Sequence, residues 1–372
     1  MSSGIVLAGG GTAGHVLPAL SIAEALVARG HQRSSIHFVG SRRGQEAVLV
    51  PRAGFGVTLL PGRGVQRRLT CQSFAATAGL GAALAMSIGL FARRRPSVVV
   101  SVGGYASLPV ALAAGLLRIP LVLCNPDAVA NSANRLVSRF AVASAVAFEG
   151  TALPRATVTG SPIRAEMLGL DRSPAGRRKA RLALGLPERR RTIAVFTGSL
   201  GSATVNCAVA GLVQRWAERE DLTVRHVIGR RDWPDLSSRF RELPPGGLCY
   251  RPVEYEEDMA TLLNAADVLV GRAGASTVAE AAAVGLASIL VPLPGAPGDH
   301  QTANAMALGR EGGSIVVANS ECNEERLAHE LDSLLGDPER LGVMEKAAVE
   351  MGHPRAADAI AELVERWAGP PT

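Results

Sequence analysis

The stretch LAGGGTAGHVLPAL, Leu7 to Leu20, follows a short apolar run and opens a segment with apolar residues at helical spacing that ends at Gly30. Its glycines lack a Cβ, so the backbone there can turn sharply and come close to a ligand. A strand, a glycine turn and a helix N-terminus together form an anion site, because unpaired N–H groups and the helix dipole point outward. The stretch therefore predicts a strand–loop–helix unit that binds an anion.

The same alternation continues along the whole chain. Short apolar runs rich in Val and Ile are separated by helical segments, which predicts parallel strands buried on both faces of a sheet. In the first half these runs are GIVLA, SIHFVG, GVTLLP, SVVVSVGG, PLVLCN, ASAVAFEG and ATVTG. In the second half they are TIAVFTGS, TVRHVIG, LCYRPV, DVLVGRAG, ASILVPLP and GSIVVA.

The alternation of apolar runs and helical segments is interrupted near Pro162 to Pro187 by prolines, charged residues and a polar helix. The 372 residues are also too many for one ordinary hydrophobic core. The sequence therefore predicts an α/β fold of two doubly wound, Rossmann-like domains that face a cleft, 1–162 and 163–349. A C-terminal helix at about 350–370 is expected to pack back on the first domain.

Composition narrows the classes of partner. Hydrophobic residues make up 47% and aromatic residues 4%, which favours helices packed on sheets through small aliphatic side chains. The net charge of +6 favours an anionic partner such as a nucleotide, a phosphate-bearing lipid or a membrane surface. Nucleic acid is not expected, because the chain has no basic stripe interleaved with aromatic residues and no recognisable nucleic-acid module.

Cysteine usage and the N-terminus bear on the compartment. The five cysteines are scattered and form no CxxC pair, which favours reduced thiols in the cytoplasm, without a disulfide framework or a metal cluster. The N-terminus has no basic region followed by an apolar core and a cleavage site, so no signal peptide is expected.

The stretch Phe74–Ala92 carries no charge and is flanked by arginines on both sides. Its length reaches the roughly 18–20 residues of a membrane-spanning helix. Three interpretations stay open: a spanning helix, a buried crossover helix, and a helix that touches anionic lipid headgroups through its flanking arginines. Abundant Ala and Gly and the neighbouring strands favour the buried crossover helix.

Gly9, Gly11 and Gly14 satisfy the GxGxxG pattern of dinucleotide sites, after a strand and before a helix. The acidic residue expected at the end of the second strand is missing, and Arg42 and Arg43 stand there instead. Those arginines suit a 2′-phosphate, so an NADP-dependent oxidoreductase is an alternative.

Similar loops recur elsewhere and favour a different interpretation. Gly198–Ser202 follows a strand, Gly274–Thr277 precedes a helix, and Gly103–Gly104 follows a strand of the first half. Glycine loops that can bind a phosphate through backbone N–H groups occur in both predicted domains. They indicate two phosphorylated ligands rather than one dinucleotide.

Five motifs carry a resemblance to a known family. GGGTAGHVLPAL, SVGGYASLP, VTGSPIR, RAGASTVAEAAAVGLASILVPLP and HQTANA resemble, in order and spacing, the MurG glycosyltransferases. The likeness runs from Leu7 to about Gly313 and is most specific from Arg272 to Asn304. That family transfers N-acetylglucosamine from its UDP donor to a muramyl-pentapeptide on undecaprenyl diphosphate, in peptidoglycan synthesis.

The resemblance implies a GT-B fold, an inverting reaction, no cofactor and no metal in the site. It implies a peripheral protein on the cytoplasmic side of the cell membrane, where an anionic membrane surface is a partner. A divergent GT-B transferase with another acceptor, or a transferase that binds a nucleotide sugar without turnover, are further alternatives.

The resemblance also implies donor-binding residues. Ser199 and Arg164 would contact the diphosphate, the backbone at Glu256 would bind uracil, and Gln301 would contact the sugar. Glu280 would bind the ribose hydroxyls. The other residues assigned to the donor site are Thr12, Ala13 and Gly14 in the first domain, and Ala275, Ser276, Thr277, Val278 and Ala279 in the second.

On the first domain, the acceptor diphosphate is expected at Gly10 and Gly11 together with Gly103, Gly104 and Tyr105. His15 is the candidate base that takes the proton from the attacking hydroxyl, because imidazole titrates near neutral pH. A role in orienting the loop or in binding the acceptor is the alternative for His15.

The chain departs from the family pattern at three places. Where the family reads HEQN this chain reads CNPD, so Asp127 stands at a donor-binding asparagine. TGSLGS replaces GGSQGA, and TAG replaces TGG at Thr12 to Gly14. A carboxylate near a diphosphate is electrostatically unfavourable, so the CNPD change bears on the acceptor and on turnover more than on the fold.

Overall fold

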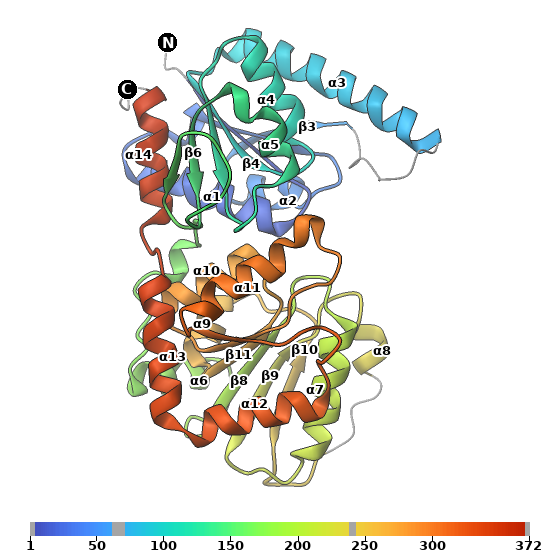
Figure 1. Cartoon of the computed structure of the whole chain (residues 1–372), viewed down its shortest axis with the longest axis vertical. Coiled ribbons are helices and arrows are strands. Elements are labelled where there is room, and N and C mark those ends of the chain that lie inside the picture. Colours follow the sequence, from blue (N-terminus) through green and yellow to red (C-terminus); the bar gives the residue numbers. More distant parts are fainter. Residues whose placement is uncertain (1–3, 62–70, 238–242, 369–372) are drawn as a thin grey trace. The chain divides into compact units, whose positions relative to one another are not determined.

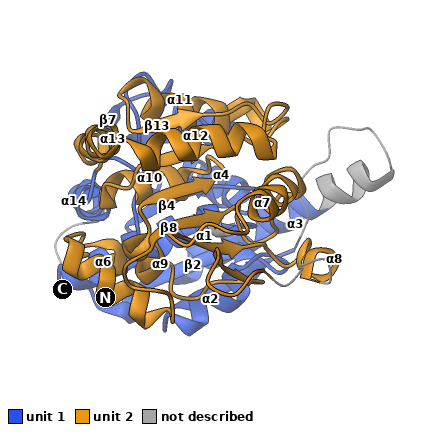
Figure 2. Cartoon of the chain, turned by 90° about the horizontal axis from the view of Figure 1, so that it is seen from below, with its two compact units in different colours: residues 1–164, 353–372 blue, residues 165–352 orange. Residues whose placement is uncertain are grey.

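The computed structural model describes residues 4–61, 71–237 and 243–368. The chain forms two compact units, coloured separately in Figure 2. Unit 1 comprises residues 1–164 together with 353–372, and unit 2 comprises residues 165–352.

Unit 1 is built on a seven-stranded parallel sheet with the strand order β3-β2-β1-β4-β5-β6-β7 (Figure 1). Its strands are β1 (Ile5–Gly9), β2 (Ile36–Ser41), β3 (Gly56–Leu60), β4 (Val98–Gly103), β5 (Leu121–Asn125), β6 (Ala141–Val146) and β7 (Ala156–Val158). Its helices are α1 (Ala13–Ala28), α2 (Glu46–Arg52), α3 (Cys71–Arg94), α4 (Ser107–Leu116), α5 (Ser132–Val137) and α14 (Ala356–Ala368), with 3-10 turns at Arg33–Ser35 and Ser138–Phe140.

Helices cover both faces of this sheet. Along β1, Ile5 and Leu7 join one buried cluster and Val6 and Ala8 join another, because successive strand side chains point to opposite faces. The first cluster includes residues of α1 and α14, and the second includes residues of α3 and α4. The continuous Val and Ile runs of the sequence follow from this burial on both sides.

The C-terminal helix α14 lies beside α1 in unit 1 (Figure 1). Ile360 and Val364 are fully buried in the same cluster as α1. At the edge of this contact the Arg29 guanidinium binds the Glu365 carboxylate at 2.8 Å. The end of the chain therefore completes the core of the unit that begins it.

Unit 2 repeats the plan with a six-stranded parallel sheet in the order β10-β9-β8-β11-β12-β13. Its strands are β8 (Arg191–Phe196), β9 (Leu222–Val227), β10 (Cys249–Val253), β11 (Val268–Gly271), β12 (Ser288–Leu290) and β13 (Ser314–Val316). Its helices are α6 (Pro174–Ala183), α7 (Ala203–Arg215), α8 (Trp233–Ser237), α9 (Met259–Ala265), α10 (Ala275–Val284), α11 (His300–Arg310), α12 (Glu324–Gly336) and α13 (Pro338–Met351), with 3-10 turns at Ala165–Met167 and Pro297–Asp299.

Both sheets have the doubly wound strand order, so the prediction of two Rossmann-like α/β units is confirmed. The order reverses between β1 and β4 in unit 1 and between β8 and β11 in unit 2. In open parallel sheets, ligands bind outside the carboxyl ends of the strands at such a reversal. The glycine loops after these four strands therefore stand where the fold places a ligand.

Helix α3 contains the uncharged stretch Phe74–Ala92. Within its described side chains, Ala83, Ser87 and Phe91 are buried on one face at helical spacing, and α3 lies along α4. Among the residues that the structure describes, no helix has the length and hydropathy needed to cross a membrane. The spanning interpretation is thus wrong for this helix, whose buried face belongs to the core of unit 1.

Candidate functional site

In unit 1 the turn after β1 leads directly into α1. Thr12 is the N-cap of α1 with extended backbone, but its side chain makes no capping hydrogen bond. Instead its hydroxyl lies 3.3 Å from Nδ1 of His15, which is half-buried in the first turn. The first N–H groups of a helix have no acceptor within the helix, so the turn at Ala13 and Gly14 presents donors to an anion.

The β4–α4 loop lies against this turn. Gly103 and Gly104 have φ of +99° and +84°, and a Cβ on Gly104 would overlap the carbonyl oxygen of Gly10. The Tyr105 hydroxyl is buried without a hydrogen-bond partner, and burial raises its pKa. The predicted acceptor residues of unit 1 are therefore neighbours, and glycine at position 104 permits their close approach.

Glu46, the first residue of α2, is a further residue of this site that no local pattern of the sequence predicts. Its side chain is 1% exposed, and its Oε2 accepts a hydrogen bond from the Gly11 N–H at 3.0 Å. Its Oε1 accepts a hydrogen bond from the Ser41 N–H at the end of β2. A buried carboxylate thus contacts the predicted acceptor turn.

The CNPD segment, which differs from the family pattern, forms a loop that asparagine side chains stabilise. The Asn125 amide donates to the carbonyls of Asp127 and Val129 at 2.7 and 3.2 Å, and its Oδ1 accepts from the Asn131 N–H at 2.9 Å. Asn134 donates to the Cys124 carbonyl at 3.0 Å. The backbone of Asp127 is thereby fixed, and its side chain is half-buried.

In unit 2 the N-terminus of α10 follows β11. Gly274 is the N-cap and gives no side-chain cap to the N–H groups of Ala275, Ser276 and Thr277. The Ser276 hydroxyl is buried without a partner. Glu280 is 5% exposed, so its side chain is buried and does not face solvent. Val278 is buried and Ala279 half-buried on the same helix.

The β8–α7 loop lies beside this helix start, because β8 and β11 are paired. Gly198 and Gly201 have φ of +92° and +88° and flank Ser199, whose carbonyl accepts from the Arg230 N–H at 3.1 Å. The Thr197 hydroxyl at the end of β8 is buried without a partner. Two buried hydroxyls without partners thus belong to the predicted donor site: Thr197 at the end of β8 and Ser276 in the first turn of α10.

Arg272 begins the most specific motif of the sequence, but no local pattern predicts a role for its side chain. Its guanidinium donates to the carbonyls of Val291 and Pro292 at 2.9 Å and to the Ser202 hydroxyl at 2.6 Å. Burial lowers the pKa of this arginine. It therefore connects the carboxyl ends of β11 and β12 to the β8–α7 loop.

Three further predicted donor residues have different surroundings. The Glu256 carboxylate accepts hydrogen bonds from the Arg225 guanidinium, the shorter at 2.7 Å. Gln301, in the first turn of α11, accepts from the Leu293 N–H through Oε1 at 3.0 Å. Arg164 is half-buried at the last position before unit 2.

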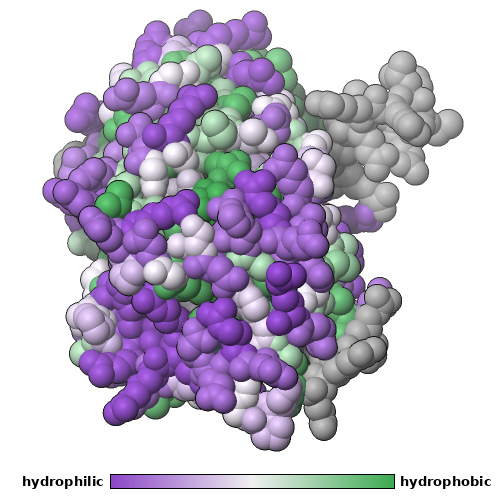
Figure 3. Space-filling view, turned by 60° about the horizontal axis from the view of Figure 1, so that its bottom comes forward, coloured by the Kyte–Doolittle hydropathy of each residue, from purple (hydrophilic) through white to green (hydrophobic). Residues whose placement is uncertain are grey.

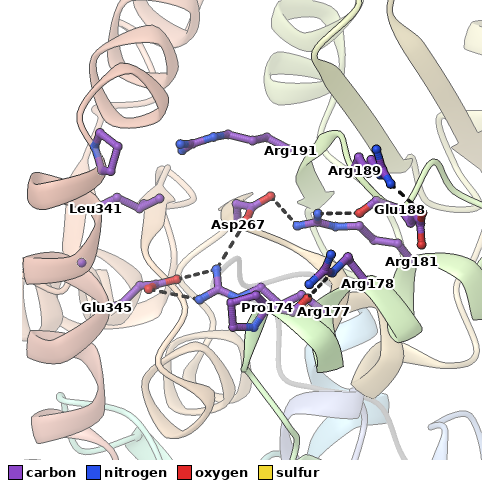
Figure 4. Close-up of a pocket in the computed structure, with 12 residues that line it drawn as sticks. Pro174, Arg177, Arg178, Arg181, Glu188, Arg189, Arg191, Asp267, Leu341 and Glu345 are labelled. Atoms are coloured by element: carbon purple, nitrogen blue, oxygen red, sulfur yellow. Dashed lines mark hydrogen bonds and ion pairs between the residues drawn. The ribbon is translucent and has the colours of Figure 1, made fainter.

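A pocket of about 440 Å³ lies at the opposite edge of the unit 2 sheet, where β8 and β11 begin (Figure 4). Figure 4 shows Asp267 between Arg177 and Arg181, with Glu345 bound to Arg177. These ion pairs join α6 and α13 to the start of β11 and so link three elements of unit 2. Among the described residues, no cluster of three or more His, Cys, Asp or Glu side chains forms a metal site.

Comparison with known proteins gives a consistent result over nearly the full length. Residues 5–146 match the N-terminal domain of glycosyltransferase family 28, and residues 192–360 match its C-terminal domain. The chain is 26% identical to a crystal structure described as Acinetobacter baumannii MurG, with a TM-score of 0.75 over 98% of this chain and 100% of that one.

Curated relatives carry the name UDP-N-acetylglucosamine--N-acetylmuramyl-(pentapeptide) pyrophosphoryl-undecaprenol N-acetylglucosamine transferase. The relative from Desulforudis audaxviator is 36% identical over 98% of each chain. The relative from Mycobacterium avium is 39% identical over 96% of this chain and 87% of its own. With this identity over nearly every residue, and with both family 28 domains in place, the chain belongs to the MurG family of UDP-sugar glycosyltransferases.

Proposed function

We propose that this protein transfers N-acetylglucosamine from UDP-N-acetylglucosamine to the muramyl-pentapeptide carried on undecaprenyl diphosphate, with inversion at the anomeric carbon. The product is the lipid-linked disaccharide unit of peptidoglycan. The observation that carries the proposal is 36% identity over 98% of both chains to a relative named for this reaction.

The donor binds to unit 2 in this proposal. The N-terminus of α10 has no side-chain cap, and it lies beside the loop that carries Ser199. A diphosphate placed there would accept from free backbone N–H groups and from the buried hydroxyls of Thr197 and Ser276. Glu280 would accept hydrogen bonds from the ribose hydroxyls, because it is ionisable and buried on the same helix.

The remaining donor contacts follow from local geometry. With the Glu256 side chain held by Arg225, the backbone there would bind uracil. Gln301 uses Oε1 within its own loop, so it would contact the sugar through its amide N–H groups. Arg164 would add positive charge at the diphosphate, and Thr12, Ala13, Gly14 and Asp127 would border the sugar.

The acceptor binds to unit 1 in this proposal. Gly10, Gly11, Gly103, Gly104 and Tyr105 are neighbours around the start of α1. Glu46 accepts from the Gly11 N–H, so the remaining backbone donors of this group and of the first turn of α1 would bind the acceptor diphosphate. His15 lies in that same first turn. It takes the proton from the attacking sugar hydroxyl while the hydroxyl oxygen attacks the anomeric carbon.

Departure of UDP breaks the bond between the anomeric carbon and the diphosphate oxygen, and negative charge builds up on that oxygen. The backbone N–H groups and the dipole at the start of α10 stabilise this charge in place before the reaction begins. Bond formation and bond breaking occur on opposite faces of the sugar, so the configuration inverts.

Attachment to the cytoplasmic face of the membrane is part of the proposal. Helix α3 exposes Met86 beside small residues and ends in Arg93 and Arg94. Such a helix end attracts anionic lipid headgroups, and the acceptor itself is a membrane lipid.

One experiment tests the activity and its alternatives. Calorimetric titration with UDP-N-acetylglucosamine, UDP and NADPH is combined with a transfer assay that uses labelled donor and lipid-linked acceptor. We expect both UDP compounds to bind and the label to appear in the lipid product. Tighter binding of NADPH than of either UDP compound would support the oxidoreductase instead. Donor binding without transfer would support a binding protein without turnover.

A further inference from the structure

Glu46 joins two segments that lie at the carboxyl ends of neighbouring strands. The Gly11 N–H in the β1–α1 turn and the Ser41 N–H at the end of β2 both donate to its carboxylate. Its side chain is 1% exposed. A charged acceptor strengthens such hydrogen bonds, so Glu46 holds the turn firmly to β2.

The backbone around this carboxylate consists largely of glycine. A Cβ added to Gly10, Gly40 or Gly44 would overlap the Glu46 side chain. In glycine turns that bind nucleotides, such space and such N–H donors serve a phosphate of the ligand. Here the protein fills the space with its own anion.

The contact between Glu46 and Gly11 affects the candidate base His15, because His15 follows Gly11 closely in the sequence. Gly11 has φ of +100° and directly precedes Thr12, the N-cap of α1. With Gly11 held by Glu46, the Thr12 hydroxyl lies next to Nδ1 of His15. A negative charge at Gly11 also disfavours a second anion there, which leaves the N–H groups of Ala13 and Gly14 for the acceptor diphosphate.

We propose that Glu46 is a positioning residue for the acceptor step: it holds Gly11, and through Gly11 it places Thr12 and His15. This inference rests on the proposed function for its kinetic consequence. Its structural consequence, the placement of His15, does not depend on turnover.

The kinetic test uses Glu46→Gln, which keeps the shape of the side chain but has one acceptor oxygen and an NH₂ group that cannot accept from Gly11. We expect kcat/KM for the lipid acceptor to fall roughly 10- to 100-fold, the effect of a small misplacement of catalytic groups. The Kd of UDP-N-acetylglucosamine should change far less, because most of the proposed contacts to the nucleotide and the diphosphate lie on unit 2.

The matched control is Glu24→Gln. Glu24 lies on α1 in the same unit and binds Arg33 at 2.7 Å, away from the turn. We expect this variant to keep the wild-type kcat/KM for the acceptor and the wild-type Kd for the donor.

Nuclear magnetic resonance of the ¹⁵N-labelled histidine ring reports the placement of His15 without any turnover. We expect the His15 signals to shift in Glu46→Gln and to stay unchanged in Glu24→Gln. A wild-type protein that transfers no sugar would refute the proposed function, while this measurement would still test Glu46. Unchanged acceptor kinetics, or lost acceptor kinetics with unchanged His15 signals, would overturn the inference.

Gly44→Ala tests the same contact with the charge retained. Gly44 lies outside the left-handed region, so alanine is compatible with its backbone, but its Cβ would displace the Glu46 carboxylate. We expect the same loss in acceptor kcat/KM. This variant keeps the inference testable if Glu46→Gln does not fold, and normal acceptor kinetics in it would overturn the inference.

Discussion

His15 and Thr12 form a side-chain pair in the first turn of α1, with 3.3 Å between the Thr12 hydroxyl and Nδ1 of the ring. In the proposed reaction, one ring nitrogen of His15 takes the proton from the attacking hydroxyl. The neighbouring backbone N–H groups are the proposed diphosphate donors, so the proposal places acid–base chemistry and diphosphate binding in one helix turn.

Replacing His15 separates its chemistry from its scaffold. If His15 is the base, His15→Ala should lower kcat by about 10²- to 10⁴-fold, because a positioned proton acceptor contributes that much. The donor Kd should stay nearly unchanged in a titration with UDP-N-acetylglucosamine. Turnover close to that of the wild type would assign His15 to the scaffold, and Asp127 would become the next candidate base.

Replacing Glu280 tests the donor site. Glu280→Ala should weaken UDP-N-acetylglucosamine binding by about 1–3 kcal/mol, the value of a hydrogen bond to a charged group. Calorimetry of the folded variant measures this change. The control is Glu330→Ala on α12, where the carboxylate binds Arg326 at 2.8 Å, and it should bind the donor normally. Wild-type affinity in Glu280→Ala would refute the ribose assignment.

At the scale of elements, the candidate sites are made by loops that two paired strands bring together. In unit 1, β1 and β4 are paired, with Gly9 opposite Gly103. In unit 2, β8 and β11 are paired, with Phe196 opposite Gly271. The loops after each pair are adjacent because parallel strands end at the same edge of a sheet.

The contact of the two unit 1 loops predicts the effect of a single methyl group. Gly104→Ala places a Cβ against the Gly10 carbonyl at a φ of +84°, so it should distort the turn. We expect the acceptor KM to rise about tenfold or more, the effect of a small misplacement, with the donor Kd unchanged. Steady-state kinetics measures this. Gly336→Ala, whose Cβ meets open space, should behave as wild type, and equal acceptor KM in both variants would refute the prediction.

If the arginines at the end of helix α3 bind the membrane, attachment should depend on the charge of the lipids and on salt. Vesicle sedimentation should show stronger binding with anionic lipid and weaker binding at high salt, because part of the attraction is screened charge. Replacing Arg93 and Arg94 with Gln should reduce binding to anionic vesicles. Equal partitioning onto neutral and anionic vesicles would remove the electrostatic part of the proposal.

At the scale of the whole molecule, the same doubly wound plan occurs twice with different polar interiors. Unit 2 buries His226, whose Nδ1 lies 2.9 Å from the Tyr250 hydroxyl and whose Nε2 lies 3.0 Å from Asn206 Oδ1. Burial lowers the pKa of His226 to about 3. Figure 3 shows one face of the molecule, on which hydrophilic residues predominate and hydrophobic residues form small groups.

The lowered pKa predicts acid sensitivity of unit 2. Between pH 6.5 and 3 the unfolded chain binds a proton at His226 that the folded chain does not, so stability is full above about pH 6.5 and falls below it. The loss should reach about 1.4 kcal/mol per pH unit. Urea unfolding followed by the fluorescence of Trp216 and Trp233 measures it.

His226→Gln should be less stable near neutral pH but should lose less stability on acidification. His329→Gln, at an exposed position of α12, should keep the wild-type dependence on pH. An equal loss on acidification in wild type and His226→Gln would show that other groups cause the acid sensitivity.

The strands, their parallel arrangement and the glycine loops after them are all predictable from the amino-acid sequence. Runs of Val and Ile indicate strands buried on both faces of a sheet, and glycine turns indicate where a strand ends and the next helix begins. Both properties are local, so the chain order alone reveals them. The motif around Ser276 and Glu280 was recognised for the same reason, because its residues are contiguous.

Side-chain contacts between segments far apart in the sequence become visible only in the folded chain. Glu46 contacts Gly11 over a separation of 35 residues, and Arg272 contacts Ser202 over 70. A carboxylate after β2 and an arginine after β11 have no local pattern that tells a surface charge from a buried one. Their roles arise when strand pairing closes two loops around them, and burial then requires that each charge find a partner.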